Sequence, residues 1–371
     1  MDLQEGDVFD GNLSVARELY ETSMSHIFLM QPTNPIPDGK VPENVILKLS
    51  KFDDESTFSE EEQTLATLGT EELKKMADDL STQIEELSHS MGASSSFDDF
   101  RRMGLLMNEQ EKVMNAIRII LHKLLLVTFE TEAEVSITMG ERFPNQFPHI
   151  IKIIRKTNGD IMAIIMEYIK GGDLSDYMEK LERPLNEEEI AQIAISILSA
   201  LEKLHACGVI YRDLKPENVL LDNDSNGEIE TIKLTDFGLA KTMRSEKSMP
   251  PRFKCGTPNY MAPECLSSDK IIYDRLTDLY AFGVLLYYMC ESRRTPFGGK
   301  RQPRVPGEQM REMNDASPFF RGLISELLSE NPKDRPQQPR NIMQKIAQYI
   351  VSKQPELRAQ EPYYSALGRV S

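Results

Sequence analysis

Residues 211–218 read Tyr211-Arg212-Asp213-Leu214-Lys215-Pro216-Glu217-Asn218. This short stretch combines a carboxylate, an ammonium group and a carboxamide, at Asp213, Lys215 and Asn218. A positioned carboxylate can accept a proton from a reacting hydroxyl, and a carboxamide oxygen can bind a hard metal ion. The stretch therefore predicts a catalytic loop with Asp213 as its general base.

Two further motifs follow along the chain. Asp236-Phe237-Gly238 comes after the strand-like run at 231–235, and Ala262-Pro263-Glu264 ends 28 residues after Asp236. Phosphoryl transfer from ATP requires neutralised phosphates, bound metal ions and an oriented hydroxyl. Asp213 would orient the hydroxyl, while Asn218 and Asp236 would bind Mg²⁺. One such tripeptide is easily a coincidence, but three motifs in this order are not.

Together the motifs resemble those of the eukaryotic-type serine/threonine protein kinases. The first matches the family pattern H-R-D-L-x-x-x-N, except that Tyr211 replaces the histidine. The resemblance covers about 13–51 and 129–352. It implies an α+β fold of two lobes, with a small β-rich N-lobe, a larger and mainly helical C-lobe, and ATP and Mg²⁺ as cofactors.

The predicted boundaries follow the composition of the chain. We expect the N-lobe at 1–168, the C-lobe at 169–352 and a flexible polar tail at 353–371. Short apolar runs predict strands within 13–49 and 149–168, the latter with an Asn158-Gly159 hairpin turn. A long amphipathic helix is predicted at 187–205, and a further hairpin around Asn226-Gly227.

Residues 52–128 are predicted to form a helical hairpin inserted into the N-lobe. Between Asp53 and Met91 there are twelve acidic residues and two basic ones. Two apolar series have helical spacing: Leu73, Met76, Leu80, Ile84, Leu87 and Met91, and then Met103, Met107, Met114, Ile117, Leu121 and Leu124. Thr70 and Ser96 are the predicted N-caps. The hairpin either packs on its host lobe with a solvated acidic face or binds a basic partner, and these alternatives stay open.

In the N-lobe, Val45-Ile46-Leu47-Lys48 resembles the family strand V-A-I-K, so Lys48 would hold the α- and β-phosphates. The alternative is an exposed lysine on an edge strand. The ion-pair partner of Lys48 should lie on the helix after the insertion. Glu134 has the best local pattern, because apolar Val135 and Ile137 follow it; its rivals are Glu130 and Glu132.

The resemblance also implies roles around the nucleotide and the catalytic loop. Met166 occupies the gatekeeper position, and Glu167 to Ile169 would bind the adenine through the backbone. Asp173 would bind either the ribose or, together with Glu217, an arginine that precedes the acceptor residue of a protein substrate. Two structural roles are implied as well: Asp278 would anchor the catalytic loop, and Arg335 would pair with Glu264.

Two segments depart from the family pattern. Tyr20, Thr22 and Ser25 occupy the three glycine positions of the phosphate-binding loop, and side chains there should weaken or reshape ATP binding. The hydroxyls of Ser23 and Ser25 could still donate hydrogen bonds to phosphate. In the activation segment, Phe253 stands at the usual phosphorylation position and cannot be phosphorylated, so Arg212 lacks its usual phosphate partner.

The sequence thus predicts an enzyme, an ATP-dependent serine/threonine protein kinase. Lys215 and the Gly256-Thr257 pair resemble the residues at these positions in serine/threonine kinases rather than those in tyrosine kinases. Lys215 is therefore also predicted to be a catalytic residue. The main alternative is a pseudokinase that binds partners without catalysis. A kinase-like enzyme for small molecules is disfavoured, because Gly256 to Glu264 matches a peptide-binding segment.

Composition excludes several other classes. A formal net charge of −16 argues against binding to nucleic acid or anionic membranes and permits basic partners or substrates. The N-terminus lacks a signal-peptide pattern, and no apolar run approaches the roughly 20 residues of a membrane span. The four cysteines have no metal-ligand spacing and are expected to be reduced thiols. A cytoplasmic protein is expected, although a host-directed effector stays open.

Overall fold

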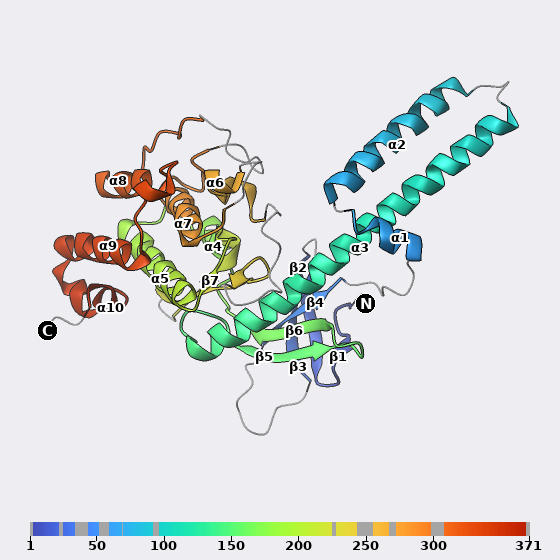
Figure 1. Ribbon diagram of the computed structural model, residues 1–371. Helices are drawn as coiled ribbons and strands as arrows, with labels where there is room; N and C mark the ends of the chain where they lie inside the picture. The colour runs from blue at the N-terminus through green and yellow to red at the C-terminus, as the bar shows by residue number, and fades with distance from the viewer. Residues whose placement is uncertain are drawn as a thin grey trace. The chain divides into compact units, whose positions relative to one another are not determined.

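The computed structural model describes residues 3–21, 25–33, 44–51, 59–68, 70–91, 96–224, 228–242, 255–266, 272–297 and 308–368 (Figure 1). The chain forms two compact units. The first comprises residues 1–49 and 128–371, and the second comprises residues 50–127. The bounds of the second unit, 50–127, agree within two residues with those of the predicted insertion, 52–128.

A six-stranded sheet of order β1-β2-β3-β4-β6-β5 forms the N-terminal part of the first unit. Its strands are β1 (Val8–Phe9), β2 (Leu13–Glu21), β3 (Ser25–Pro32), β4 (Val45–Ser50), β5 (Ile150–Arg155) and β6 (Ile161–Glu167). Val45, Leu47 and Leu49 are buried, as the two-residue period of a strand requires. The predicted strands are confirmed, and so is the turn between β5 and β6, where Gly159 has a φ of +96°.

The remainder of the first unit is mainly helical, so the fold is α+β. Its helices are α4 (Leu174–Lys180), α5 (Glu187–Ala206), α6 (Pro263–Leu266), α7 (Arg275–Cys290), α8 (Pro318–Leu327), α9 (Pro339–Lys353) and α10 (Tyr363–Leu367). Helix α5 was predicted at 187–205, and Asn186 and Glu189 form its capping box. Helix α7 is buried on all sides, which is typical of a helix at the centre of a core.

Short elements connect these helices. They are the strands β7 (Val209–Ile210), β8 (Val219–Asn223), β9 (Ile229–Leu234) and β10 (Lys241–Thr242) and the 3₁₀ turns η2 (Pro216–Asn218), η3 (Pro258–Tyr260), η4 (Pro332–Asp334) and η5 (Pro355–Ala359). Strands β8 and β9 pair antiparallel, whereas Asn226 and Gly227 of the predicted hairpin turn lie outside the described residues. No helix in the described part of the chain is long and apolar enough to cross a membrane.

The prediction of a flexible tail at 353–371 is wrong for most of that segment. The chain forms η5 and α10 there, and Leu357, Tyr363 and Ala366 are buried in the core of the first unit. These apolar side chains are widely spaced among polar residues, so composition alone concealed them. Their burial fixes the segment against α5 and α9.

The second unit contains α1 (Glu60–Leu65), α2 (Thr70–Ser90) and most of α3 (Phe97–Arg142). Ser96 caps α3 as predicted: Asp99 N donates to its hydroxyl, and Asp99 Oδ2 accepts from Ser96 N at 2.8 Å. Helix α2 begins at Thr70 itself, one residue before the predicted start. Helix α3 continues to Arg142 without a break, whereas we expected a separate helix after the insertion. Residues 105–139 contain neither glycine nor proline, so the sequence offers no site for that break.

The first half of the predicted apolar series of α2, which runs from Leu73 to Met91, packs within the second unit. Leu73 of α2 is fully buried with Val113 and Ala116 of α3. Further α2 residues pack around them, namely Met76, Ala77 and Leu80. The first half of the α2 apolar series is therefore packed inside the second unit.

Candidate active site

Lys48 on β4 forms a buried ion pair with Glu132 on α3. Its ammonium nitrogen lies 2.7 Å from each carboxylate oxygen, and the two side chains are only 11% and 2% exposed. Lys48 is therefore not an exposed lysine on an edge strand. The predicted partner, Glu134, is wrong: it is exposed, and the rival Glu132 takes the position.

The geometry of α3 explains the error. The buried face of its last turns carries Phe129, Glu132, Ser136 and Met139, which follow the helical period. Glu134 lies two positions from Glu132, so it points about 200° away around the helix. The apolar Ile137 misled the prediction, because it is only partly buried.

Asp236 also contacts Lys48. Its Oδ1 lies 3.3 Å from Lys48 Nζ, and its φ of +60° is a strained value for a residue with a side chain. Burial would raise the pKa of Asp236, but attraction to Lys48 and Lys215 outweighs it and lowers the pKa below the ordinary value. Asp236 is thus held ionised. Its side chain keeps 41% of its surface exposed, so it can accept further ligands.

Asp213 is held by neighbours from three directions. Its Oδ1 accepts hydrogen bonds from the backbone N of Thr257 at 3.0 Å and from the Thr257 hydroxyl at 2.8 Å. Its Oδ2 lies 3.1 Å from Lys215 Nζ and accepts from Asn218 Nδ2 at 3.1 Å. The structure thus brings the three predicted residues of the loop together and orients the Asp213 carboxylate.

Asp278 anchors the catalytic loop, as the resemblance implied. This carboxylate on α7 is 1% exposed and accepts from the backbone N of Tyr211 at 2.9 Å and of Arg212 at 2.8 Å. It also bonds His205 Nε2 at 2.7 Å. Arg212 has a φ of +69°, so two backbone hydrogen bonds hold the loop where its backbone is strained.

Tyr211, the departure from the family histidine, connects the catalytic loop to Asp236. Its buried hydroxyl donates to the carbonyl of Thr235, the residue before Asp236. Its ring lies 5.5 Å from that of Phe237, which lies 5.7 Å from Phe147. Sequence reasoning missed this link, because nothing in a loop motif shows which carbonyl a tyrosine will reach.

The donor set fits Mg²⁺. The Asn218 amide nitrogen donates to the carbonyl and carboxylate of Asp213, which directs its amide oxygen elsewhere. With the ionised Asp236, that gives two hard oxygen ligands. No group of three or more His, Cys, Asp or Glu side chains in the described ranges could hold a metal ion by itself. Magnesium commonly binds through one or two carboxylates together with substrate phosphates, so two protein ligands suffice.

The predicted adenine-side residues lie at the end of β6 and beyond it. Met166 and Ile169 are buried, at 7% and 6% exposure. Glu167 is held by Lys233 of β9, whose Nζ lies 2.8 and 2.7 Å from its two carboxylate oxygens. This pair, which the sequence did not predict, fixes the segment that would contact adenine. That Met166, Glu167 and Ile169 bind the nucleotide stays a prediction.

Asp173 has a structural role that the sequence did not assign. It is the N-cap of α4, and its Oδ1 accepts from Asp176 N at 2.8 Å. Burial raises its pKa. Glu217 is exposed in the catalytic loop. The ribose and the substrate arginine stay alternative ligands of Asp173.

The glycine-poor loop lies between β2 and β3. Ser23 and Thr22 lie outside the described residues, and Ser25 is fully buried at the start of β3. Tyr20 is 55% exposed, yet the pKa of its hydroxyl is raised to about 12. Burial is the largest cause of this rise; attraction to Lys48 opposes it, and the charges of Asp236 and Asp173 add to it. The Tyr20 hydroxyl is therefore coupled electrostatically to the charged residues of the site.

The end of the activation segment is fixed by the implied pair of Arg335 and Glu264. Arg335 is 2% exposed, and its guanidinium donates two hydrogen bonds, of 2.7 and 2.8 Å, to the Glu264 carboxylate. Arg212 Nη1 contacts Cys255 Sγ at 3.5 Å, and its guanidinium lies 4.5 Å from the ring centre of Tyr273. Phe253 lies outside the described residues.

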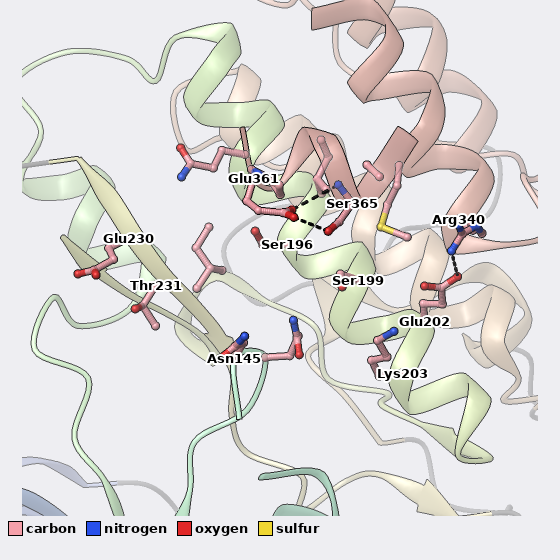
Figure 2. Close-up of a pocket in the computed structure, with 17 residues that line it drawn as sticks. Asn145, Ser196, Ser199, Glu202, Lys203, Glu230, Thr231, Arg340, Glu361 and Ser365 are labelled. Atoms are coloured by element: carbon pink, nitrogen blue, oxygen red, sulfur yellow. Dashed lines mark hydrogen bonds and ion pairs between the residues drawn. The ribbon is translucent and has the colours of Figure 1, made fainter. Parts of the chain in front are cut away.

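One cavity of about 690 Å³ lies in the first unit away from these residues (Figure 2). Residues from α5, β9, α9 and α10 line it. Two interactions join lining residues: Arg340 lies 3.7 Å from Glu202, and the Ser365 hydroxyl donates to Glu361 at 2.6 Å (Figure 2). No predicted catalytic residue lines this cavity, so it is not the active site.

Comparison with known proteins agrees with the geometry. The protein kinase domain family matches residues 105–349. The chain is 39% identical over 188 residues to serine/threonine-protein kinase pkn3 of Myxococcus xanthus, covering 47% of this chain and 34% of that protein. It is 36% identical over 184 residues to unc-51 of Caenorhabditis elegans, covering 46% and 21%. It is 36% identical over 209 residues to human RAC-beta serine/threonine-protein kinase, covering 55% and 41%.

The chain therefore spans well under half the length of these relatives. The match to the family nevertheless includes most of this chain and every motif of the catalytic loop and the activation segment. The two-part α+β architecture and the Lys48–Glu132–Asp236 arrangement agree with it. The chain belongs to the protein kinase family.

Proposed function

We propose that this chain is an active serine/threonine protein kinase that uses ATP and Mg²⁺. The observation that carries the proposal is the contact of Lys48 with both Glu132 and Asp236. In kinases the Lys–Glu pair and the metal-binding Asp must both be in place for transfer. Here the three charges lie in one cluster, in which Lys48 and Glu132 are buried and Asp236 is partly exposed. An inactive relative would have no need to retain them.

Each of these residues would have a distinct role in the reaction. Lys48 would bind the phosphates, and Asn218 with Asp236 would hold Mg²⁺, which neutralises charge on the phosphates. Asp213 would accept the proton of the Ser or Thr hydroxyl. The hydroxyl oxygen then bonds to the γ-phosphorus of ATP, and the bond between that phosphorus and ADP breaks. Lys215, which lies 3.1 Å from Asp213, would stabilise the charge that develops between acceptor and phosphate.

The pseudokinase alternative rests on the glycine-poor loop. A test is transfer of radiolabelled phosphate from ATP to a generic basic protein by the wild type, Asp213→Asn and Asp236→Ala. We expect transfer by the wild type and a loss of about 10² to 10⁴-fold in Asp213→Asn, because a general base contributes that much. Equal, residual turnover in all three would favour the pseudokinase.

We also propose a preference for basic residues on the N-terminal side of the acceptor. The support is Glu217, an exposed carboxylate in the catalytic loop, and the partly exposed carboxylate of Asp173. A peptide array should show arginine enriched before the acceptor, and Glu217→Gln should reduce that enrichment. An array without any arginine preference would contradict the proposal.

A further inference from the structure

Helix α3 has a row of exposed apolar side chains in the second unit. Phe100, Met107, Met114 and Leu121 are 61%, 57%, 45% and 56% exposed. The sequence placed three of them in the same helically spaced series as Ile117. The structure divides it, because Ile117 packs against α2 while this row does not. We call these four residues the α3 row.

The row lies on the side of α3 that is turned away from the hairpin core. The buried α3 residues in that core are Val113 and Ala116, with Ile120 packed beside them. At about 100° per residue, they lie roughly 120° to 180° around the helix from Met107. Helix α3 is therefore apolar on two faces, and only one of them is packed in the hairpin. A helix with two apolar faces is typical of an element that has two packing partners.

The spacing of the row indicates a helix as its second partner. Its four residues are seven apart throughout, which is the repeat of coiled-coil packing. A groove of about 550 Å³ follows it and is lined by Gly104, Met107, Glu111, Met114 and Arg118, among others. Apart from its chain neighbours and the backbone of its own helix, nothing lies within 4 Å of a Cβ position at Gly104, so another helix can approach closely there. Methionine adapts its shape to such contacts.

We propose that the α3 row is the interface through which two copies of this chain pair, with their α3 helices antiparallel. Charge beside the row favours this occupant. Glu111 and Arg118, both exposed, flank the row and are also seven residues apart. Arg118 contacts Asn115 of its own helix at 3.3 Å. In a parallel pair, residues at this heptad position face a different position of the partner helix, so Glu111 and Arg118 would not pair with each other.

An antiparallel pair brings opposite charges together instead. When Met107 lies level with Arg118 of the second copy, Glu111 lies level with Met114 of that copy, by symmetry. Helical side chains lean towards the N-terminus of their own helix. Glu111 and Arg118 of the second copy therefore lean towards each other. The two-fold axis repeats the pair, so two ion pairs would flank an apolar seam.

The test uses the full chain in sedimentation equilibrium at several concentrations. We expect the wild type to dimerise, and Met107→Glu/Met114→Glu to dimerise more than about 100-fold more weakly, because the change removes four buried methionines per dimer. Leu105→Glu is the matched control: Leu105 is 61% exposed on the same helix but lies off the row. It should dimerise like the wild type, and circular dichroism should show equal helix content in all three.

Charge exchange tests the orientation. Glu111→Arg and Arg118→Glu should each weaken the dimer, and the double exchange should restore it, because each charge again faces its opposite. A wild type that stays monomeric at all concentrations would overturn the proposal. A dimer that is insensitive to the methionine changes would overturn it as well. Failure of the double exchange to restore pairing would exclude the antiparallel arrangement.

Discussion

Glu132→Gln tests the assignment that the sequence alone got wrong. Glu132 is 1% exposed, and both of its carboxylate oxygens lie 2.7 Å from Lys48 Nζ. Breaking a buried ion pair by removing one partner commonly costs 3–5 kcal/mol, because one charge is left alone. Asp236 remains 3.3 Å from Lys48 and compensates in part. We therefore expect a loss of about 3 kcal/mol in the free energy of unfolding.

The same change should impair catalysis. Without Glu132, Lys48 has Asp236 as its remaining acidic partner in the cluster, and it would be drawn away from the phosphates. Loss of one preorganised electrostatic contact typically costs about 10² to 10³-fold in kcat. The assays are urea unfolding and steady-state phosphotransfer. We expect kcat to fall by about 100-fold, at the lower end of this range, because Lys48 itself remains.

Glu134→Gln is the matched control, with the same chemistry on the same helix. Because Glu134 is exposed, the free energy of unfolding should change by no more than about 0.5 kcal/mol and kcat should be unaffected. The reasoning would be refuted if the two variants behaved alike, or if Glu134→Gln were the impaired one.

Three further outcomes are expected. Tyr211→Phe removes the donor to the Thr235 carbonyl and should lower the free energy of unfolding by about 1–3 kcal/mol in urea titrations; unchanged stability would contradict that role. The pKa of Glu132 is raised to about 7; burial is the largest cause of this shift, and attraction to Lys48 opposes it. The Glu132 carboxylate therefore gains a proton as the pH falls through that value. Wild-type kcat should therefore fall below about pH 7, whereas residual activity of Glu132→Gln should show no such limb. Tyr20→Gly should lower the KM for ATP in initial-rate assays, because glycine at this position of the loop would let the backbone approach the phosphates closely; a higher KM would show that Tyr20 aids binding.

The sequence predicted best the residues that lie in short, contiguous motifs. Asp213, Lys215 and Asn218 are close together because one tight loop positions all three, and spacing alone reveals such a loop. Strands with a two-residue apolar period, such as β4, were equally accessible. The Asp278 and Arg335 contacts followed from the resemblance, and the structure confirms them.

Features that depend on helical phase or on distant packing were harder to predict. To choose among Glu130, Glu132 and Glu134, one must know to within one residue which face of α3 is buried. Apolar neighbours on both faces of the helix obscured that face. The same two-faced pattern hid the α3 row. The Tyr211 hydroxyl bond and the Lys233–Glu167 pair join residues that are 24 and 66 positions apart, so no local pattern indicates them.

The most direct test of the central claim is phosphoamino-acid analysis of a generic basic protein after incubation with ATP, Mg²⁺ and the full chain. We expect phosphoserine and phosphothreonine with the wild type and neither above background with Asp213→Asn. Phosphate on tyrosine alone would contradict the serine/threonine assignment, and equal labelling by wild type and Asp213→Asn would contradict the role of Asp213 as the base.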